Sequence, residues 1–329
     1  MTESSTPRHP VFVVGMPRSG TTLLSSLLDA HPDLVIAPET HYFTRCWTGG
    51  RIDGWAEVER MLARLDQQPG VHDMGLAEEE WATIRERLRA LEAPTHGDIL
   101  RAVLDTYAAR SDAPAWGEKT PDHLRTIPEM ARQFPGAVFI AIVRDPRDVA
   151  LSLRALPWNH KTLPEQAWTW RRYAARTVRY HKTLGDRFFS LRYEDLITEP
   201  EATLRDVCMF LEMPFRASML RREGEEDRPF DAEREPWKEK SGRQIDPSNR
   251  EKWRTQMPEA ERVLVERIAG HWLAEFGYAR PAVRWRLALV SSLLRRLGEA
   301  LFQRGRRALE NLRSGRLFRD NAAPRWMED

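Results

Sequence analysis

The sequence predicts an α/β protein built in three layers, with a central parallel sheet between two layers of helices. Three short runs rich in β-branched and aromatic residues, at 11–14, 34–37 and 137–143, have the character of buried parallel strands. A glycine-containing turn and a helix with apolar periodicity over 22–30 join the first run to the second. A strand, a turn, a helix and a second strand in this order open a nucleotide-binding α/β domain.

The other regular elements follow from the same periodicities. Residues 188–193 are predicted to form a further strand, and residues 224–249 are charged and irregular, which is typical of a loop. Asp145 suits the N-cap of the helix that follows residue 143, and Pro146 suits its first position. Helices are predicted over 146–155, 165–184, 199–211 and 258–276.

Residues 42–114 interrupt the α/β pattern. This segment consists of charged, tryptophan-containing stretches with helical spacing, so we expect an all-helical insertion. Such insertions in α/β enzymes commonly shape or cover the substrate site. The predicted organisation is one domain over 1–280 that contains this insertion, followed by a basic helical extension over 281–329.

The extension has the pattern of an amphipathic helix. Five of its apolar residues recur at alternating spacings of three and four, and arginines crowd the other faces. Such a helix docks on its own domain or on a partner subunit, or it lies on an anionic membrane surface, or it contacts nucleic acid. We therefore expect a homodimer or membrane-surface contact through residues 283–319. The seam residues are Leu287, Val290, Leu294, Leu297 and Leu301.

Composition excludes several other classes. The 51 Lys and Arg residues nearly balance the 49 Asp and Glu residues, giving a net charge of +2, so bulk charge predicts no nucleic-acid partner. Cys46 and Cys208 are too few for a disulfide framework and are predicted to be buried, reduced thiols. Residues 1–10 are polar and lack the apolar run of a secretory signal, which leads us to expect a cytoplasmic location.

The loop after the first strand, Gly15-Met-Pro-Arg-Ser-Gly-Thr-Thr22, has the frame of a phosphate-binding P-loop. Two glycines five residues apart follow a strand and open a helix, so backbone N–H groups can hold a phosphate. Thr21 occupies the position where a Walker A loop has the lysine that reaches the β- and γ-phosphates. The loop therefore predicts a P-loop-like domain whose ligand has no γ-phosphate and needs no metal, with Arg18 supplying a cation instead.

A second phosphate site is predicted at the end of the strand over 137–143. Arg144 leaves the carboxyl end of this strand, where open α/β sheets bind their ligands, and its guanidinium can grip a phosphate with two hydrogen bonds. Ser152 lies about two turns into the following helix and can donate a hydroxyl. The competing interpretation of Arg144 is a surface salt bridge with Asp145 or Asp148.

Together, Pro17-Arg-Ser-Gly-Thr-Thr-Leu-Leu24 and Val143-Arg-Asp-Pro-Arg-Asp-Val-Ala-Leu-Ser152 resemble the two phosphate motifs of the sulfotransferases that use 3′-phosphoadenosine 5′-phosphosulfate (PAPS). Leu28-Asp-Ala-His-Pro32 and Pro38-Glu-Thr40 most resemble the tyrosylprotein sulfotransferases and their bacterial relatives. The resemblance implies transfer of a sulfuryl group from PAPS to an acceptor hydroxyl. It also implies that the donor's 3′-phosphate is held by Arg144 and Ser152, and its 5′-phosphate by Ser19, Gly20, Thr21 and Thr22.

The resemblance also implies roles at the reacting centre. Glu39 matches the family's general base, which takes the proton of the acceptor, and His41 is the alternative base; a capping or salt-bridging role for Glu39 competes with this interpretation. His31 is expected to hold the turn at 30–32. Lys119 and Arg18 are the implied cations that stabilise the transferring group, although an exposed lysine is the common alternative.

Three further residues match positions that contact the donor: Tyr193 at the end of a strand, and Ser241 and Lys252, which close over the nucleotide. A further family arginine falls at Leu156, so that either Arg154 substitutes for it or the contact is missing. Two other functions compete, a Mg²⁺-dependent kinase or NTPase and a non-catalytic nucleotide-binding scaffold. The acceptor stays open between a phenol, a sugar and a lipid alcohol.

Overall fold

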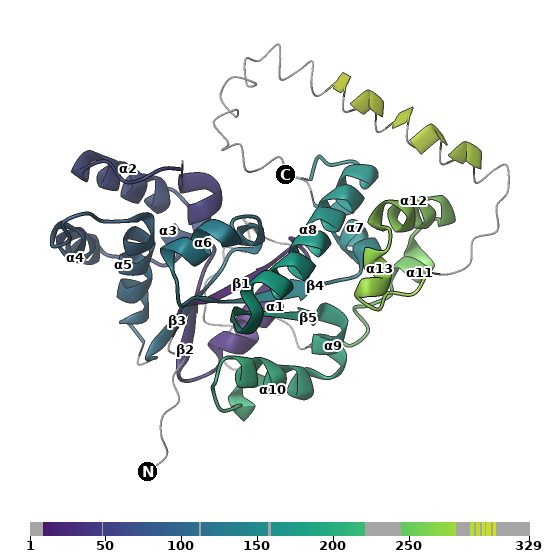
Figure 1. The fold of residues 1–329 in the computed structure, drawn as a ribbon. Helices are drawn as coiled ribbons and strands as arrows, with labels where there is room; N and C mark the ends of the chain where they lie inside the picture. The colour runs from purple at the N-terminus through teal and green to yellow at the C-terminus, as the bar shows by residue number, and fades with distance from the viewer. Residues whose placement is uncertain are drawn as a thin grey trace. The chain divides into compact units, whose positions relative to one another are not determined.

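The computed structural model describes residues 9–47, 49–111, 113–156, 159–220 and 245–280, together with parts of 290–306 (Figure 1). The chain forms two compact units. The first combines residues 1–142 with 179–247, and the second combines residues 143–178 with 248–329.

The first unit contains a five-stranded sheet in the order β2-β3-β1-β4-β5. β1 pairs in parallel with β3 and β4, and β2 pairs in parallel with β3. This confirms the predicted central parallel sheet. The strands are β1 (Val11–Gly15), β2 (Leu34–Ala37), β3 (Ala115–Lys119), β4 (Val138–Val143) and β5 (Phe188–Arg192).

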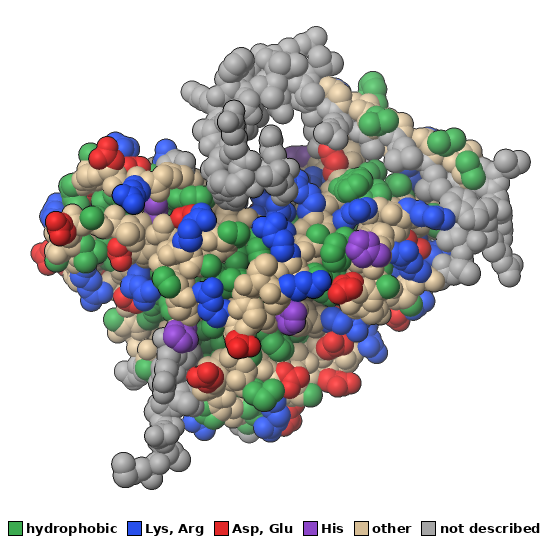
Figure 2. Space-filling model, in the orientation of Figure 1, with side chains coloured by type: hydrophobic (Ala, Val, Ile, Leu, Met, Phe, Trp, Pro, Cys, Tyr) green, Lys and Arg blue, Asp and Glu red, His purple; other side chains and the backbone are tan. Residues whose placement is uncertain are grey.

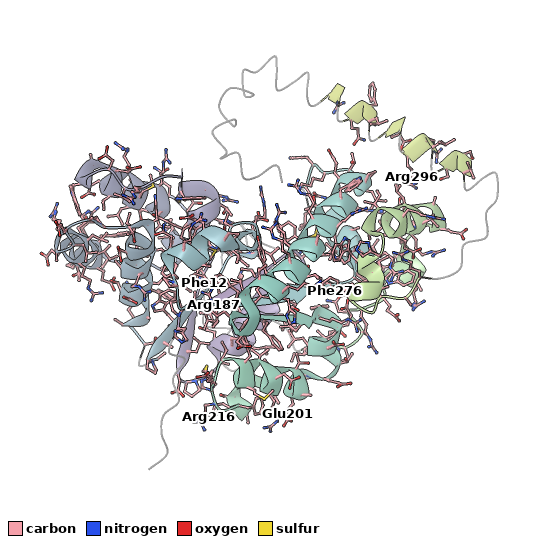
Figure 3. The ribbon with its side chains drawn as sticks, in the orientation of Figure 1. Phe12, Arg187, Glu201, Arg216, Phe276 and Arg296 are labelled. Carbon is pink, nitrogen blue, oxygen red and sulfur yellow. The ribbon has the colours of Figure 1, made fainter. Side chains whose placement is uncertain are left out.

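Alternating side chains place an apolar core on each face of the sheet. Val11 and Val13 belong to a cluster that includes α1 (Thr21–Asp29), α9 (Tyr193–Thr198) and α10 (Pro200–Phe210). Phe12 points to the opposite face because successive side chains of a strand alternate. There its ring lies 5.6 Å from the Phe139 ring and 5.4 Å from the Phe134 ring; Figure 3 labels Phe12. Helices α5 (His96–Ala108) and α6 (Ile127–Gln133) pack against each other, and α5 contacts β2 and β3. The sheet thus lies between two layers of helices, which makes three layers in all.

Strand β3 is not among the strands predicted from the sequence. Its sequence, Ala-Trp-Gly-Glu-Lys, has no β-branched residue and carries two charges, yet all five residues are buried. The strand lies between β1 and β2, and ladder hydrogen bonds on both sides override its weak propensity. Gly117 allows close packing here, since a Cβ atom at this position would lie 2.5 Å from the Ile36 side chain.

The segment between β2 and β3 is helical, as expected for the insertion. A short π-helix, η1 (Tyr42–Cys46), comes first, and no strand interrupts this segment in its described residues. Helix α5 contacts both β2 and β3, so the end of the insertion is part of the sheet's covering layer. The other helices are α2 (Trp55–Asp66), α3 (Pro69–Asp73) and α4 (Glu78–Arg89).

The second unit is helical, and α8 (Leu163–Leu184) passes from it into the first unit. The helix predicted over 258–276 is divided in the structure, because Gly270 adopts φ +66° and ends α12 (Glu259–Ala269). Trp170 packs its ring 6.3 Å from the Phe276 ring (Figure 3). Besides α8 and the described part of 290–306, this unit contains the helices α7 (Pro146–Arg154), α11 (Trp253–Gln256), α12 and α13 (Trp272–Glu275). The first unit also contains short 3₁₀ turns, η2 (Pro121–Arg125), η3 (Gly185–Arg187) and η4 (Ala217–Leu220).

Both cysteines are free and buried, as predicted. Burial raises the pKa of the Cys46 thiol to about 12 and that of Cys208 to about 11. No helix among the described residues is long and apolar enough to span a bilayer. Acidic and basic side chains are interspersed over the face shown in Figure 2, which agrees with the near-balanced composition.

Much of the predicted C-terminal extension lies outside the described residues. The described part of 290–306 is helical, and Leu294, Leu301 and Phe302 are exposed there. Leu287 and Leu297, two of the five seam residues, are outside it. The extension therefore stays a prediction.

Candidate active site

The loop between β1 and α1 has the geometry of a phosphate cradle. Gly20 adopts φ +100° and forms the N-cap of α1, and Arg18 adopts φ +73°. Because the first turn of a helix leaves backbone N–H groups without internal partners, this end of α1 can bind an anion. Ser19 supports this interpretation. Its Oγ is buried and has no hydrogen-bond partner among the described residues, so an incoming ligand oxygen would satisfy it.

Tyr193 lies directly against this loop. A Cβ atom at Gly20 would be 2.3 Å from Cδ2 of the Tyr193 ring, so only a glycine fits between loop and ring. Tyr193 is the first residue of α9 rather than the last residue of a strand. The structure thus brings together the phosphate loop and Tyr193, both of which are predicted to bind the donor, although they are about 170 positions apart in the sequence.

Glu39, which follows β2, and Lys119, the last residue of β3, meet Thr22 of α1 at the carboxyl edge of the sheet. The Ala37–Glu118 register of β2 and β3 sets the residue two positions after β2 beside the last residue of β3. The Lys119 ammonium forms an ion pair with Glu39 Oε1 and lies 3.4 Å from Thr22 Oγ1, at the start of α1. Lys119 is 7% exposed and Glu39 is 26% exposed, so the pair is shielded but open to an incoming molecule.

The charges around Glu39 keep it ionised. Burial alone raises the pKa of this carboxyl, but the Lys119 ammonium and the hydrogen bond and charge of His41 outweigh burial and hold the pKa well below the ordinary value. His41 Nε2 lies 3.2 Å from Glu39 Oε2. At neutral pH Glu39 is therefore an anion able to accept a proton. Because the Lys119 ammonium lowers the pKa of Glu39, the carboxylate becomes a stronger base when Lys119 pairs with another anion instead.

The two histidines that flank Glu39 in the sequence have different surroundings. His31 is buried, its Nε2 lies 2.9 Å from the Pro214 carbonyl oxygen, and its Nδ1 accepts the Asp33 amide at 3.0 Å. These contacts support the turn-holding role predicted for His31. Only His41 contacts the Glu39 carboxylate.

Sequence reasoning missed Glu118, which stands one residue before Lys119. Its carboxylate is fully buried and accepts the Thr40 amide at 3.0 Å and the Thr40 hydroxyl at 2.9 Å. Burial raises the pKa of Glu118, whereas His123 and the surrounding donors lower it, and the net direction is downward. The signal was an acidic residue inside a five-residue buried strand, which could be found only once that strand was recognised.

In the second unit, Arg144 follows β4 directly and is held at both ends. Its carbonyl oxygen accepts the Trp170 indole N–H at 2.8 Å, and its guanidinium donates to the Asn249 carbonyl oxygen at 2.9 Å. Asp145 caps α7 by accepting the Arg147 amide, as predicted, and forms its ion pair with Arg147 at 2.6 Å. Burial raises the pKa of Asp148 while the Arg144 charge lowers it, so Arg144 also interacts electrostatically with one of the two partners named in the competing interpretation.

The remaining predicted residues are distributed as follows. Ser152 lies on α7 and Lys252 is the exposed N-cap of α11. The residue after Lys252, Trp253, donates its amide to Asp148 Oδ1 at 3.0 Å and packs its ring 3.6 Å from the Arg147 guanidinium carbon. Ser241 lies outside the described residues.

Arg154 forms an ion pair with Glu261 in the same unit, so this contact competes with the substitution proposed for the family arginine at Leu156.

Within the described ranges, no group of three or more histidine, cysteine or acidic side chains could hold a metal ion.

Solved structures share this fold. The chain superposes on the sulfotransferase domain of the Synechococcus PCC 7002 olefin synthase with a TM-score of 0.60 and 24% identity, covering 85% of this chain and 98% of that one. The sulfotransferase domain from the curacin biosynthetic pathway gives a TM-score of 0.57 and 21% identity, covering 83% and 99%. At these identities the similarity is one of fold.

Curated relatives are also similar to this chain. Protein-tyrosine sulfotransferase 1 of Danio rerio is 27% identical over 218 residues, which are 65% of this chain and 56% of the relative. The Drosophila melanogaster protein-tyrosine sulfotransferase is 26% identical over 272 residues, 75% and 47% of the two chains. The match thus spans about half the length of these relatives.

The prediction of a cytoplasmic location is wrong on this comparison. Protein-tyrosine sulfotransferases act on secreted proteins in the Golgi lumen. The prediction depended only on the polar character of residues 1–10, which carries no comparable weight.

The pattern of the Sulfotransferase family itself matches residues 10–217. This range begins just before β1, includes the phosphate loop, Glu39, Lys119 and Arg144, and ends beyond α10. It confirms the family that the two phosphate motifs indicated: the chain belongs to the sulfotransferases.

Proposed function

We propose that this protein transfers a sulfuryl group from PAPS to the hydroxyl group of an acceptor. The observation that carries the proposal is the meeting of Glu39, Lys119 and Thr22 beside the phosphate loop. A base, a cation and an anion cradle at one edge of the sheet are the groups that in-line transfer between two oxygens requires.

The donor would be held through its two phosphates. We assign its 5′-phosphosulfate to the backbone and hydroxyls of Ser19, Gly20, Thr21 and Thr22, with Tyr193 packed behind the loop. The unsatisfied buried hydroxyl of Ser19 suits such an anion. We assign the 3′-phosphate to Arg144 and Ser152, and contacts that close over the donor to Ser241 and Lys252, on their sequence motifs.

In the transfer step, the acceptor oxygen attacks sulfur while the bond from sulfur to the 5′-phosphate oxygen breaks. The acceptor proton passes to a Glu39 carboxylate oxygen, and 3′-phosphoadenosine 5′-phosphate (PAP) leaves with the electron pair of the broken bond. Lys119 and Arg18 stabilise the charge that develops on the peripheral and leaving oxygens. No step in this sequence requires a metal ion.

The acceptor is a hydroxyl compound whose class we infer to be a phenol. The relatives named as protein-tyrosine sulfotransferases favour this class, while sugar and lipid alcohols remain the alternatives to test.

A homodimer or membrane-surface contact through 283–319 is a separate proposal, supported by the exposed apolar side chains of the described helical part.

Calorimetry with two nucleotides tests the proposed function. The full chain should bind PAP without added metal, and it should bind Mg-ATP at least about 100-fold more weakly, because the loop has no lysine for a γ-phosphate. Turnover is then measured with PAPS and a panel of a phenol, a sugar and a lipid alcohol. Tight binding of Mg-ATP alone would refute the proposal, and PAP binding without transfer to any acceptor would favour a non-catalytic scaffold.

Gly20→Ala is expected to weaken PAP binding by at least about tenfold. The substitution adds a Cβ atom to a residue with φ +100° and drives it into the Tyr193 ring, so the loop must move away from its phosphate-binding shape. Calorimetry with PAP measures the loss.

Gly185→Ala is the matched control for Gly20→Ala. Gly185 also has positive φ, at +53°, but a Cβ atom there meets nothing within 4 Å. It should therefore lose stability without losing PAP affinity. Equal affinities of the Gly20→Ala variant and the wild type would show that the loop does not hold the nucleotide.

A further inference from the structure

A single buried carboxylate organises the backbone that follows Glu39. Glu118 accepts the amide and the hydroxyl of Thr40, the hydroxyl of Thr120, and Nδ1–H of His123 at 3.1 Å. Three of these hydrogen bonds end on Oε1 and one ends on Oε2, so both carboxylate oxygens are hydrogen-bonded. An ionised group buried without such donors is strongly destabilising, so these hydrogen bonds are what stabilise the buried Glu118 carboxylate.

The three side chains bound to Glu118 each receive a further amide of the same segment. The His41 amide donates to the Thr120 hydroxyl at 3.2 Å, and the Tyr42 amide donates to the Thr40 hydroxyl at 3.3 Å. The Phe43 amide donates to His123 Nε2 at 3.3 Å. All four amides from Thr40 to Phe43 therefore end on Glu118, directly or through one side chain.

These contacts also define the state of His123. A backbone N–H can only donate, so Nε2 of the ring is the acceptor and Nδ1 carries the proton given to Glu118. His123 is thus held as the neutral Nδ1–H tautomer. Each relay then runs in one direction, from amide to side chain to carboxylate.

The segment needs such support because its backbone is constrained on both sides. His41 is a non-glycine residue at φ +51°, a left-handed conformation that is unfavourable for a residue with a Cβ atom. On the other side α3 packs against Glu39, since a Cβ atom at Gly70 would lie 2.3 Å from the Glu39 carbonyl oxygen. Together they direct the side chains of Glu39 and His41 toward each other, 3.2 Å apart.

We propose that Glu118 is a positioning residue for the sulfuryl-transfer reaction. Its buried carboxylate fixes the backbone from Thr40 to Phe43 and thereby the direction in which Glu39 presents its carboxylate to the acceptor. Glu118 itself does not contact the reacting atoms. The proposal rests on the proposed function for its kinetic consequence and on the hydrogen bonds alone for its structural one.

The test combines two measurements on Glu118→Gln, which keeps the size of the side chain and removes its charge. Hydrogen exchange of the peptide covering 38–45 should become at least about tenfold faster, since hydrogen bonds to a charged group are lost. With PAPS, kcat should fall about 100-fold, because small displacements of a catalytic group have effects of this size. The KM for PAPS and the affinity for PAP should stay unchanged, because no donor-binding residue is altered.

Two further variants make the result decisive. Thr120→Val removes the relay to the His41 amide alone and should give a smaller effect in the same direction, even if Glu118→Gln folds poorly. Glu129→Gln changes another buried glutamate of the first unit, on α6, and should leave exchange and turnover as in the wild type.

Each outcome decides one of the two proposals. Unchanged exchange over 38–45 in both Glu118→Gln and Thr120→Val overturns the positioning role, and so does a rise in KM for PAPS that equals the fall in kcat. A wild-type protein that transfers sulfuryl to no acceptor of the panel overturns the proposed function, while the exchange measurement still decides the role of Glu118.

Discussion

Glu39→Gln is expected to lower kcat for sulfuryl transfer by about 10²- to 10⁴-fold, the usual contribution of a positioned general base. The amide keeps the shape of the side chain but cannot take the acceptor proton. Removing the negative charge also frees Lys119 from its ion pair. Since the phosphate loop is untouched, PAP binding measured by calorimetry should be retained or become tighter.

The control for this variant is Glu201→Gln. Glu201, labelled in Figure 3, lies on α10, has a side chain that is 56% exposed, and forms an ion pair with Arg205 one turn along the same helix. It should turn over at the wild-type rate. If Glu39→Gln retained more than about a tenth of the wild-type kcat, Glu39 would not be the base and His41 would be the next residue to replace.

Lys119→Met is expected to lower kcat by about 10²- to 10³-fold, as the loss of one preorganised charge at a reacting centre does. It also changes the pH dependence in a defined direction. The Lys119 ammonium lowers the pKa of Glu39, so its removal raises that pKa. Glu39 is then protonated at a higher pH, and the acid limb of the kcat/KM profile should move to higher pH.

The pH profile separates this role from a general loss of activity. Lys119→Arg retains a positive charge and should keep the acid limb near its wild-type position. Lys182→Met removes an exposed lysine of α8 and should change neither rate nor profile. An acid limb in Lys119→Met at the wild-type position would mean that Lys119 does not act on Glu39.

The parts of the fold that the sequence predicts are those with strong local signals. The β-branched runs of β1 and β4 are long enough to identify buried strands, and the loop between β1 and α1 has glycines where its backbone needs them. Glu39 is recognisable because it directly follows such a strand. In each case a short segment contains its own physical explanation.

Strand β3 lacks such a signal, and the organisation of the site depends on it. Its five residues look like a charged turn, and only pairing with both neighbours makes them a strand. Without the strand, the alternation that sends Lys119 toward Glu39 and Glu118 into the Thr40 network is invisible. Hydrogen bonds across 78 residues, such as that from the Thr40 amide to Glu118, have no local pattern to predict them.

Gly70 has a consequence for protein engineering. Because α3 of the helical insertion packs against the backbone of Glu39 with no room for a side chain, the insertion is not an independent cassette. A chimaera that exchanges residues 42–114 to change acceptor preference also replaces the helix that packs against the backbone of Glu39, the proposed base. Such a graft should keep a glycine at this contact, or take its own segment at 38–43 along with the new insertion.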